Sequence, residues 1–217
     1  INCIIKSAQK AAGLSRQMLA YAGKQQIAKR ATDLNELIRQ YQTILESTCR
    51  KNQELNLDLC EEPIVSKIDL TQVEQVVLNL MTNAVQASTD EGRITITTGV
   101  QTIKDVEGDC SLYGTSATGG EFCFIDVADS GSGVSQLDME RIFEPFFTNS
   151  ELGRGLGLSV VYGVVVGHEG FIKCSSRIGQ GTSFRVLFPV TAEPTINSPS
   201  DVDVEQAARD EFANDWD

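Results

Sequence analysis

The sequence predicts an α+β domain in which helices cover one face of a mixed sheet, and a long helix precedes this domain. Two observations lead to this class: amphipathic helical segments and short strand-like runs are interspersed along the chain, and no internal repeat is present. The 217 residues suffice for one full domain with its own core. We therefore divide the chain into a helix at 1–30, the main domain at 31–190 and an acidic tail at 191–217.

Apolar periodicity and capping residues predict five helices, which cover residues 2–28, 34–48, 70–89, 135–143 and 156–168. The apolar stripe of the first helix is broad and has no sheet to pack on. This segment is either an ordinary surface helix or one that pairs with another helix in a hairpin or dimer. Asp33 is the expected N-cap of the second helix. Asp69 caps the third, unless that helix begins later and uses Thr71 with Glu74 as a capping box.

Six strand-like runs are predicted at residues 55–60, 64–68, 93–101, 122–128, 170–176 and 182–188. The stretch 102–120 is rich in Gly, Ser, Thr and Asp, and we expect it to be a long hairpin loop. A turn at 178–181 joins the last two strands, and Pro189 ends the core. The tail combines Pro, Ser and high charge, which is typical of disorder.

Charge and composition exclude several classes of function. The net charge is −12, of which the tail carries −7, and no basic patch stands out, so nucleic-acid binding is disfavoured. No apolar run is long enough for a membrane helix. A membrane contact could therefore come only through upstream segments, and a cytoplasmic location is expected. The six cysteines form no CxxC pair and only one histidine exists, which argues against structural zinc and for free thiols.

A first polar cluster lies on the third predicted helix. Asn79, Asn83 and Gln86 follow i, i+4, i+7 spacing and so share one helix face. Neutral amides can bind Mg²⁺ through their oxygens and phosphates through their NH₂ groups. The alternative is an ordinary solvated polar face.

A second cluster follows the strand at 122–128. Asp129 is delivered by an apolar strand, and Gly131 and Gly133 then allow a close approach of the backbone. The dinucleotide-binding fingerprint GxGxxG is absent. Many tight turns have the same pattern, so this cluster alone does not define a site.

A third cluster, residues 153–159, opens the helix at 156–168. Glycine-rich backbone at a helix N-terminus is suited to phosphate, because free N–H groups and the helix dipole both favour an anion. It is not a Walker A loop, because no GK[ST] follows. A flexible structural turn remains the alternative.

Together, in this order and spacing, the clusters resemble the ATP-binding catalytic domain of sensor histidine kinases. That superfamily includes gyrase, heat-shock chaperones and mismatch-repair ATPases. Residues 74–86 resemble the family's N box, and residues 129–133 resemble its first glycine box. Residues 142–148 resemble the phenylalanine box, residues 153–159 the second glycine box and residues 181–184 the closing strand motif. The resemblance covers about residues 31–190 and implies a two-layer α/β sandwich.

The resemblance implies which residues bind ATP and Mg²⁺. Asp129 would accept a hydrogen bond from the adenine amino group, and Thr182 would support the adenine with a shared water. Asn79 and Asn83 would hold Mg²⁺ and the phosphates. The implied nucleotide-binding set is completed by Gln86, Gly131, Gly133, Phe147, Thr148, Gly153, Arg154, Gly155, Leu156, Gly157 and Leu158.

The resemblance also implies a mobile lid at 147–154, with the segment 153–158 covering the triphosphate. Gln86 and Asn149 stand where many family members carry a cation. We expect Arg154 to compensate, because a guanidinium in the lid can reach a phosphate.

Position 79 distinguishes phosphoryl transfer from hydrolysis. In the ATPase members of the superfamily, a Glu four residues before the Mg-binding Asn activates water. Here that position is Asn79, whose amide is not basic. Transfer of the γ-phosphoryl group to the neutral imidazole of a histidine is therefore expected, with Asn79, Asn83 and Arg154 as the catalytic set.

Residues 8–21 resemble the second helix of the family's dimerisation and phosphotransfer hairpin. The first helix, which carries the acceptor histidine, would then precede Ile1. This implies a homodimer through the hairpin and a response regulator or receiver domain as partner. The sole histidine, His168, is expected to be a turn or packing residue. Two alternatives remain: a related anti-sigma-type serine kinase, and a degenerate ATP-binding domain that only dimerises or docks a partner.

Overall fold

The computed structural model describes residues 27–104, 112–114, 119–148 and 155–191. The predicted first helix lies outside these residues except for Ile27 and Ala28, which are not helical. The acidic tail lies outside them from residue 192 onward. Within the described residues, no helix is both long and apolar enough to cross a membrane.

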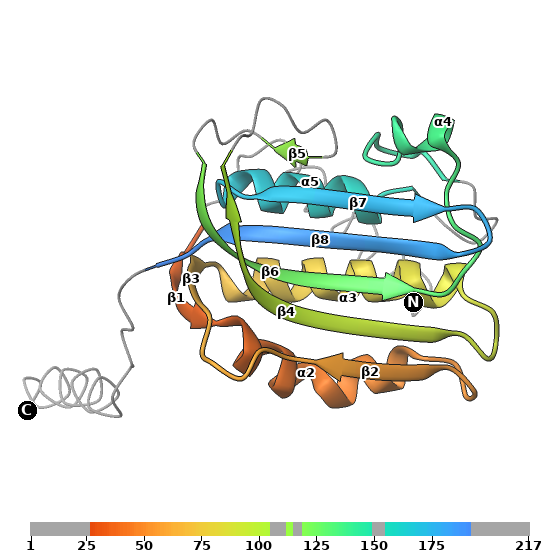
Figure 1. Cartoon of the computed structure of the whole chain (residues 1–217), viewed down its shortest axis with the longest axis horizontal. Helices are drawn as coiled ribbons and strands as arrows, with labels where there is room; N and C mark the ends of the chain where they lie inside the picture. Colours follow the sequence, from red (N-terminus) through yellow and green to blue (C-terminus); the bar gives the residue numbers. More distant parts are fainter. Residues whose placement is uncertain (1–26, 105–111, 115–118, 149–154, 192–217) are drawn as a thin grey trace, which may run out of the picture.

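A six-stranded mixed sheet forms one layer of the domain, in the order β2-β4-β6-β8-β7-β5 (Figure 1). Its strands are β2 (Glu54–Asp58), β4 (Arg93–Ile103), β5 (Leu112–Gly114), β6 (Gly120–Asp129), β7 (Phe171–Arg177) and β8 (Gly181–Pro189). β2 is parallel to β4, and every other neighbouring pair is antiparallel. The predicted mixed sheet is therefore confirmed.

Three helices form the second layer: α2 (Leu34–Thr48), α3 (Leu70–Ala87) and α5 (Gly157–Gly167) (Figure 1). They pack on one face of the sheet, as predicted. Between α2 and α3 the chain forms β2 and then β3 (Val65–Ile68), which pairs with β1 (Arg30–Asp33) in a separate two-stranded sheet.

Two aspartates begin the helices of this layer, as the sequence predicts. Asp33 caps α2 by accepting a hydrogen bond from the Asn35 N–H at 3.0 Å. Asp69 caps α3 by accepting one from the Gln72 N–H at 3.2 Å. Each cap satisfies a backbone donor that the first helical turn leaves without an intrahelical partner. Because α3 begins at Leu70, the alternative capping box of a later start is not used.

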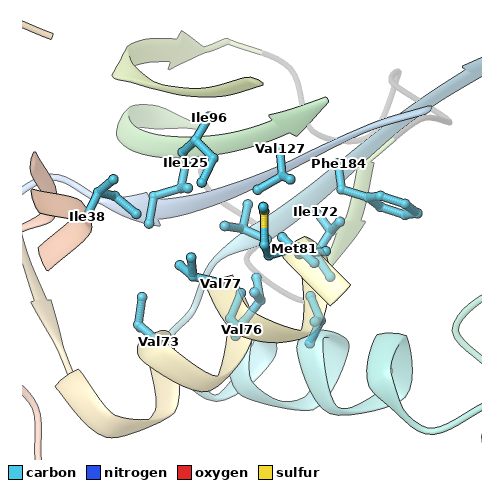
Figure 2. Packing of buried hydrophobic residues seen from close by; sticks show 14 of the residues in the cluster. Ile38, Val73, Val76, Val77, Met81, Ile96, Ile125, Val127, Ile172 and Phe184 are labelled. Carbon is cyan, nitrogen blue, oxygen red and sulfur yellow. The ribbon is translucent and has the colours of Figure 1, made fainter. Parts of the chain in front are cut away.

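The space between the two layers is filled by one large apolar cluster (Figure 2). Ile125 and Val127 of β6 point into it and meet Val76, Val77 and Met81 of α3. The opposite, open face of the sheet carries a smaller separate cluster of Ile103, Phe122, Phe124, Phe171 and Leu187. Because side chains alternate along a strand, these two clusters identify which residues of β6 and β8 face the helices.

Three elements differ from the prediction. The stretch 102–120 is not entirely loop, because β4 extends to Ile103 and β5 pairs with the edge of β7. The sequence does not predict β1. Both missed strands are only three or four residues long and exist through pairing with a distant partner strand, which local propensity does not reveal. The predicted helix 135–143 shortens to α4 (Gln136–Met139), after which the chain turns.

Candidate functional site

Asp129 ends β6, and backbone groups orient its carboxylate. Oδ1 accepts hydrogen bonds from the N–H of Gly131 at 2.7 Å and from the N–H of Thr182 at 3.3 Å. Among the described residues, no group donates to Oδ2. The carboxylate is therefore fixed through one oxygen and presents the other to a donor from outside the fold.

The surroundings of Asp129 disfavour its charge. Burial raises the pKa of this carboxyl above its ordinary value, and the N–H groups of Gly131 and Thr182 offset part of the rise. Carboxyl groups whose pKa is shifted by burial occur often at functional sites.

The loop after β6 presses against two neighbouring elements through its glycines. A Cβ on Gly131 would lie 2.3 Å from the carbonyl oxygen of Ala87, the last residue of α3. A Cβ on Gly133, whose φ is +70°, would lie 2.2 Å from the carbonyl oxygen of Arg177. The Ser132 N–H also donates to the Ala87 carbonyl at 3.1 Å. The close approach expected of these glycines is thus to the protein's own backbone, and it anchors the Asp129 loop to α3.

Thr182 closes the same end of the sheet. It is buried, and its Oγ1 lies 2.9 Å from the Oγ of Ser176, its partner across the β7–β8 pair. The Ser176 Oγ also accepts a hydrogen bond from the Val134 N–H at 2.8 Å. Asp129, Ser176 and Thr182 border a hollow of about 480 Å³. Ser176 is a site residue that the sequence analysis misses, although the register of the predicted hairpin would place it opposite Thr182.

Asn79 and Asn83 lie one turn apart on α3 and face the beginning of α5. The Nδ2 of Asn79 lies 3.4 Å from the Gly157 carbonyl oxygen, and a Cβ on Gly157 would lie 3.7 Å from Asn83 Oδ1. Asn83 makes no hydrogen bond to another described residue. Gln86 is exposed, and its side chain likewise makes no hydrogen bond to another described residue.

The N-terminus of α5 is suited to an anion. Its N-cap, Leu156, provides no side-chain hydrogen bond to the N–H groups that the first helical turn leaves without an intrahelical partner. These groups and the helix dipole both favour negative charge. Along α3, Asn83 and Ala87 are one turn apart, about 6 Å. The anion site and the Asp129 loop are therefore arranged along the same helix.

The phenylalanine-rich segment leads from α4 toward α5. Phe147 lies beneath the guanidinium of Arg141, with Cζ 4.7 Å from the ring centre. Phe146 is 59% exposed, has a φ of +69°, and donates its N–H to the Gly155 carbonyl at 2.7 Å. This brings Phe147 and the exposed Thr148 close to Gly155. Gly153 and Arg154 lie outside the described residues.

His168, expected to be a turn or packing residue, is 2% exposed at the C-cap of α5. Its ring hydrogen-bonds to the backbone through both nitrogens.

Residues 68–192 match the family described as histidine kinase-, DNA gyrase B- and HSP90-like ATPases, which is more than half of the chain. The chain belongs to this family. Within it, the matched region is the ATP-binding catalytic domain of a two-component sensor histidine kinase.

The chain is also similar to three individual proteins. The sensor kinase CckA of Brucella abortus (strain 2308) is 36% identical over 188 residues, which are 86% of this chain and 20% of that protein. The chain thus spans a fifth of that relative. The histidine kinase ThkA, crystallised with the response regulator protein TrrA, is 25% identical with a TM-score of 0.59, over 88% of this chain and 50% of that one. Full-length ShkA in complex with AMPPNP shares the fold, with 21% identity and a TM-score of 0.67 over 88% of this chain and 38% of that one.

Proposed function

We propose that the chain is the catalytic part of a histidine kinase that transfers the γ-phosphoryl group of ATP to a histidine on an upstream helix. The observation that carries this proposal is the position of α3. Its last residue anchors the Asp129 loop, and one turn earlier Asn83 faces the uncapped N-terminus of α5. One helix thus aligns a hydrogen-bond acceptor suited to a nucleobase with an anion site suited to phosphates.

Each part of the nucleotide has a partner in this arrangement. Asp129 accepts a hydrogen bond from the adenine amino group through Oδ2, the oxygen that Gly131 and Thr182 leave free. Thr182 supports the adenine through a shared water, and Ser176 positions the Thr182 hydroxyl. The N-terminus of α5 and the segment 153–158 bind the phosphates. Within that segment, Arg154 supplies the cation that Gln86 does not.

The residues present fit Mg²⁺ as well. Asn79 and Asn83 offer amide oxygens beside the phosphate site, and oxygen ligands are those that Mg²⁺ prefers. Among the described residues, no group of three His, Cys, Asp or Glu is placed to hold a metal. Asn79 and Asn83 would hold the ion, which would supply positive charge against the negative charge of the phosphoryl group in transfer.

Transfer is favoured over hydrolysis because no base lies beside the phosphate site on α3. Asn79 cannot remove a proton from water, since an amide is not basic. Glu74 lies beside Tyr41 of α2 and raises the pKa of that phenol, so its carboxylate is directed away from Asn79. A protein nucleophile, the neutral imidazole of the acceptor histidine, then takes the phosphoryl group.

The partners follow from the same reading. The chain forms a homodimer through its N-terminal helix and a missing partner helix, and it delivers phosphate to a response regulator or receiver domain, in a cytoplasmic setting. The structure of ThkA with the response regulator protein TrrA is a precedent for such a partner.

Label transfer tests this function. The chain is prepared together with the upstream helix from its own gene and incubated with Mg²⁺ and γ-labelled ATP. Protein-bound label that is stable in alkali and lost in acid is expected, because phosphohistidine has this lability and phosphoserine the opposite. Asn83→Ala serves as the impaired variant, and Asp126→Asn, on the open face of the sheet, serves as the matched control.

The other outcomes correspond to the two alternatives. Acid-stable label would indicate a serine kinase of the anti-sigma type. Nucleotide binding without any transfer, or no binding at all, would indicate a domain that dimerises or docks a partner without catalysis. The oriented carboxylate and the uncapped helix favour the catalytic reading, because a docking module needs neither.

A further inference from the structure

Helices α3 and α5 are antiparallel and are joined by two polar contacts, one near each end of α5. Near the nucleotide site, Asn79 Nδ2 lies 3.4 Å from the Gly157 carbonyl at the start of α5. At the opposite end, the Asp69 N–H at the start of α3 donates to His168 Nε2 at 2.9 Å, just after α5. Val77 and Leu80 of α3 and Val161 of α5 are buried members of the same apolar core cluster. Interdigitating apolar side chains already limit how one helix lies along the other, and the two polar contacts add directional constraints on their register.

The tie at His168 requires a neutral imidazole. The Asp69 N–H can only donate and the Val164 carbonyl can only accept, so Nε2 carries the lone pair and Nδ1 carries the proton. The Nδ1–H donates to Val164 at 2.8 Å and thereby fixes the ring to the last turn of α5. The ring also packs edge-on against Phe188 of β8, with the ring centres 5.8 Å apart.

The segment Ile27–Lys29, which leads into the domain, contacts Asp69 and the residues on either side of His168. The Ala28 N–H donates to Asp69 Oδ2 at 3.0 Å, while Asp69 Oδ1 caps α3. The Lys29 ammonium pairs with Glu169 at 2.9 Å. Ile27 lies over Gly167, where an added Cβ would come within 3.0 Å of its Cδ1. A displacement of this segment therefore acts directly on Asp69 and on the turn that carries His168.

We propose that His168 is a positioning residue for phosphoryl transfer, which links the segment Ile27–Lys29 and the start of α3 to the end of α5 and thereby sets the helix register at the nucleotide site. This inference rests on the proposed function, because it assigns nucleotide binding to the start of α5 and the second half of α3. It also gives the upstream hairpin a route to the site, since Ile27 and Ala28 are the last residues of the segment predicted as the first helix.

Protonation of His168 would break this link. A proton on Nε2 would face the Asp69 N–H, so two donors would oppose each other where one hydrogen bond had been. The charged groups around the ring are Lys29, Asp69 and Glu169: Lys29 opposes a positive ring, and the two acids favour it. Burial outweighs these charges and lowers the pKa of His168 below its ordinary value, so the ring is neutral at neutral pH.

Because His168 is the only histidine in the chain, the test has a direct spectroscopic readout. In protein free of affinity-tag histidines, imidazole ¹⁵N resonances report the tautomer and the titration of this one residue. Mg-ATP affinity is measured by calorimetry at neutral and mildly acidic pH for the wild type, His168→Gln and His168→Leu. The Gln amide oxygen can replace Nε2 as an acceptor without titrating, whereas Leu offers no acceptor. Glu169→Gln is the control for the neighbouring charge.

The proposal expects a neutral ring protonated at Nδ1, and a loss of Mg-ATP affinity on acidification that is at least about fivefold larger for the wild type than for His168→Gln. The Ala28 amide resonance should move with the same titration. His168→Leu should bind more weakly at every pH, and His168→Gln should restore binding at neutral pH. Glu169→Gln should still lose affinity on acidification, but at a lower pH than the wild type, because it removes one acid that favours the charged ring.

Equal pH profiles of Mg-ATP affinity in the wild type and His168→Gln would overturn the proposal. An Ala28 amide resonance that does not shift while His168 titrates would also overturn it. If His168→Leu does not fold, the comparison of the wild type with His168→Gln decides alone. A wild type that binds no Mg-ATP at neutral pH would instead refute the proposed function, which separates the two failures.

Discussion

Replacement of Asp129 by asparagine separates nucleotide recognition from stability, because ATP affinity should fall while the stability of the fold should not. Two backbone N–H groups hold Oδ1, at 2.7 and 3.3 Å, so the asparagine oxygen must take that place. Its NH₂ group then occupies the position of Oδ2 and faces the adenine amino group, donor against donor. A hydrogen bond to a charged group contributes about 2–3 kcal/mol, so Mg-ATP affinity should fall roughly 30- to 150-fold.

The same substitution should not weaken the fold. Since burial raises the pKa of Asp129, the folded state holds this proton more readily than the unfolded chain, and keeping the group ionised costs folding free energy at neutral pH. Asp129→Asn should therefore unfold at an equal or higher urea concentration than the wild type. Its advantage should shrink as the pH falls through the raised pKa, where the wild-type carboxyl becomes neutral.

Calorimetric titration of Mg-ATP, paired with urea unfolding, measures both effects. Asp126→Asn is the matched control, three residues earlier on the same strand but on the open face. Asp126 is 8% exposed and accepts from Arg185 at 2.7 Å and from Ser183 at 2.6 Å, so its loss should destabilise the fold and leave ATP affinity unchanged. Unchanged affinity in Asp129→Asn would refute the adenine assignment.

Three further predictions concern other parts of the structure. Asn83→Ala should weaken Mg-ATP binding about tenfold and leave adenosine binding unchanged, because the amide faces the phosphate site; calorimetry with both ligands checks this. Gly181→Ala should lower the urea midpoint far more than Gly179→Ala: both have positive φ, but a Cβ on Gly181 would lie 1.8 Å from the Asp129 carbonyl oxygen and one on Gly179 would contact nothing within 4 Å. Finally, since the pKa of His168 is lowered by folding, stability should fall as the pH drops below about 6.5, by no more than about 1.4 kcal/mol per pH unit. Urea unfolding across this range should show a flatter profile for His168→Gln, and equal slopes would contradict the assignment.

Sequence analysis succeeds where the determining interactions are local. Asp33 and Asp69 are identifiable as caps because each carboxylate acts within its own first helical turn. It fails where an element exists through a distant partner: β5 has three residues and depends on pairing with β7. The candidate site divides in the same way. The local sequence pattern after β6 identifies Asp129, Gly131 and Gly133. Ser176, in contrast, acquires its role only through the strand register that places it opposite Thr182.

His168 illustrates an intermediate case. Its burial agrees with the expectation of a packing residue, because a lone histidine after an apolar helix is more often structural than reactive. Its two backbone hydrogen bonds depend on how α3 docks against α5, and no local pattern records that docking.

The position of β8 in the sheet has a consequence for the order in which the protein becomes functional during synthesis. β8 is the last strand among the described residues, yet it lies between β6 and β7 and supplies Gly181 and Thr182 to the Asp129 end of the sheet. A nascent chain that has not yet released β8 from the ribosome lacks the Thr182 N–H that orients Asp129, and it exposes the facing edges of β6 and β7. Such edges pair readily with other strands. Nucleotide recognition therefore begins only when the final strand is inserted, and until then the protein depends on protection of two open strand edges.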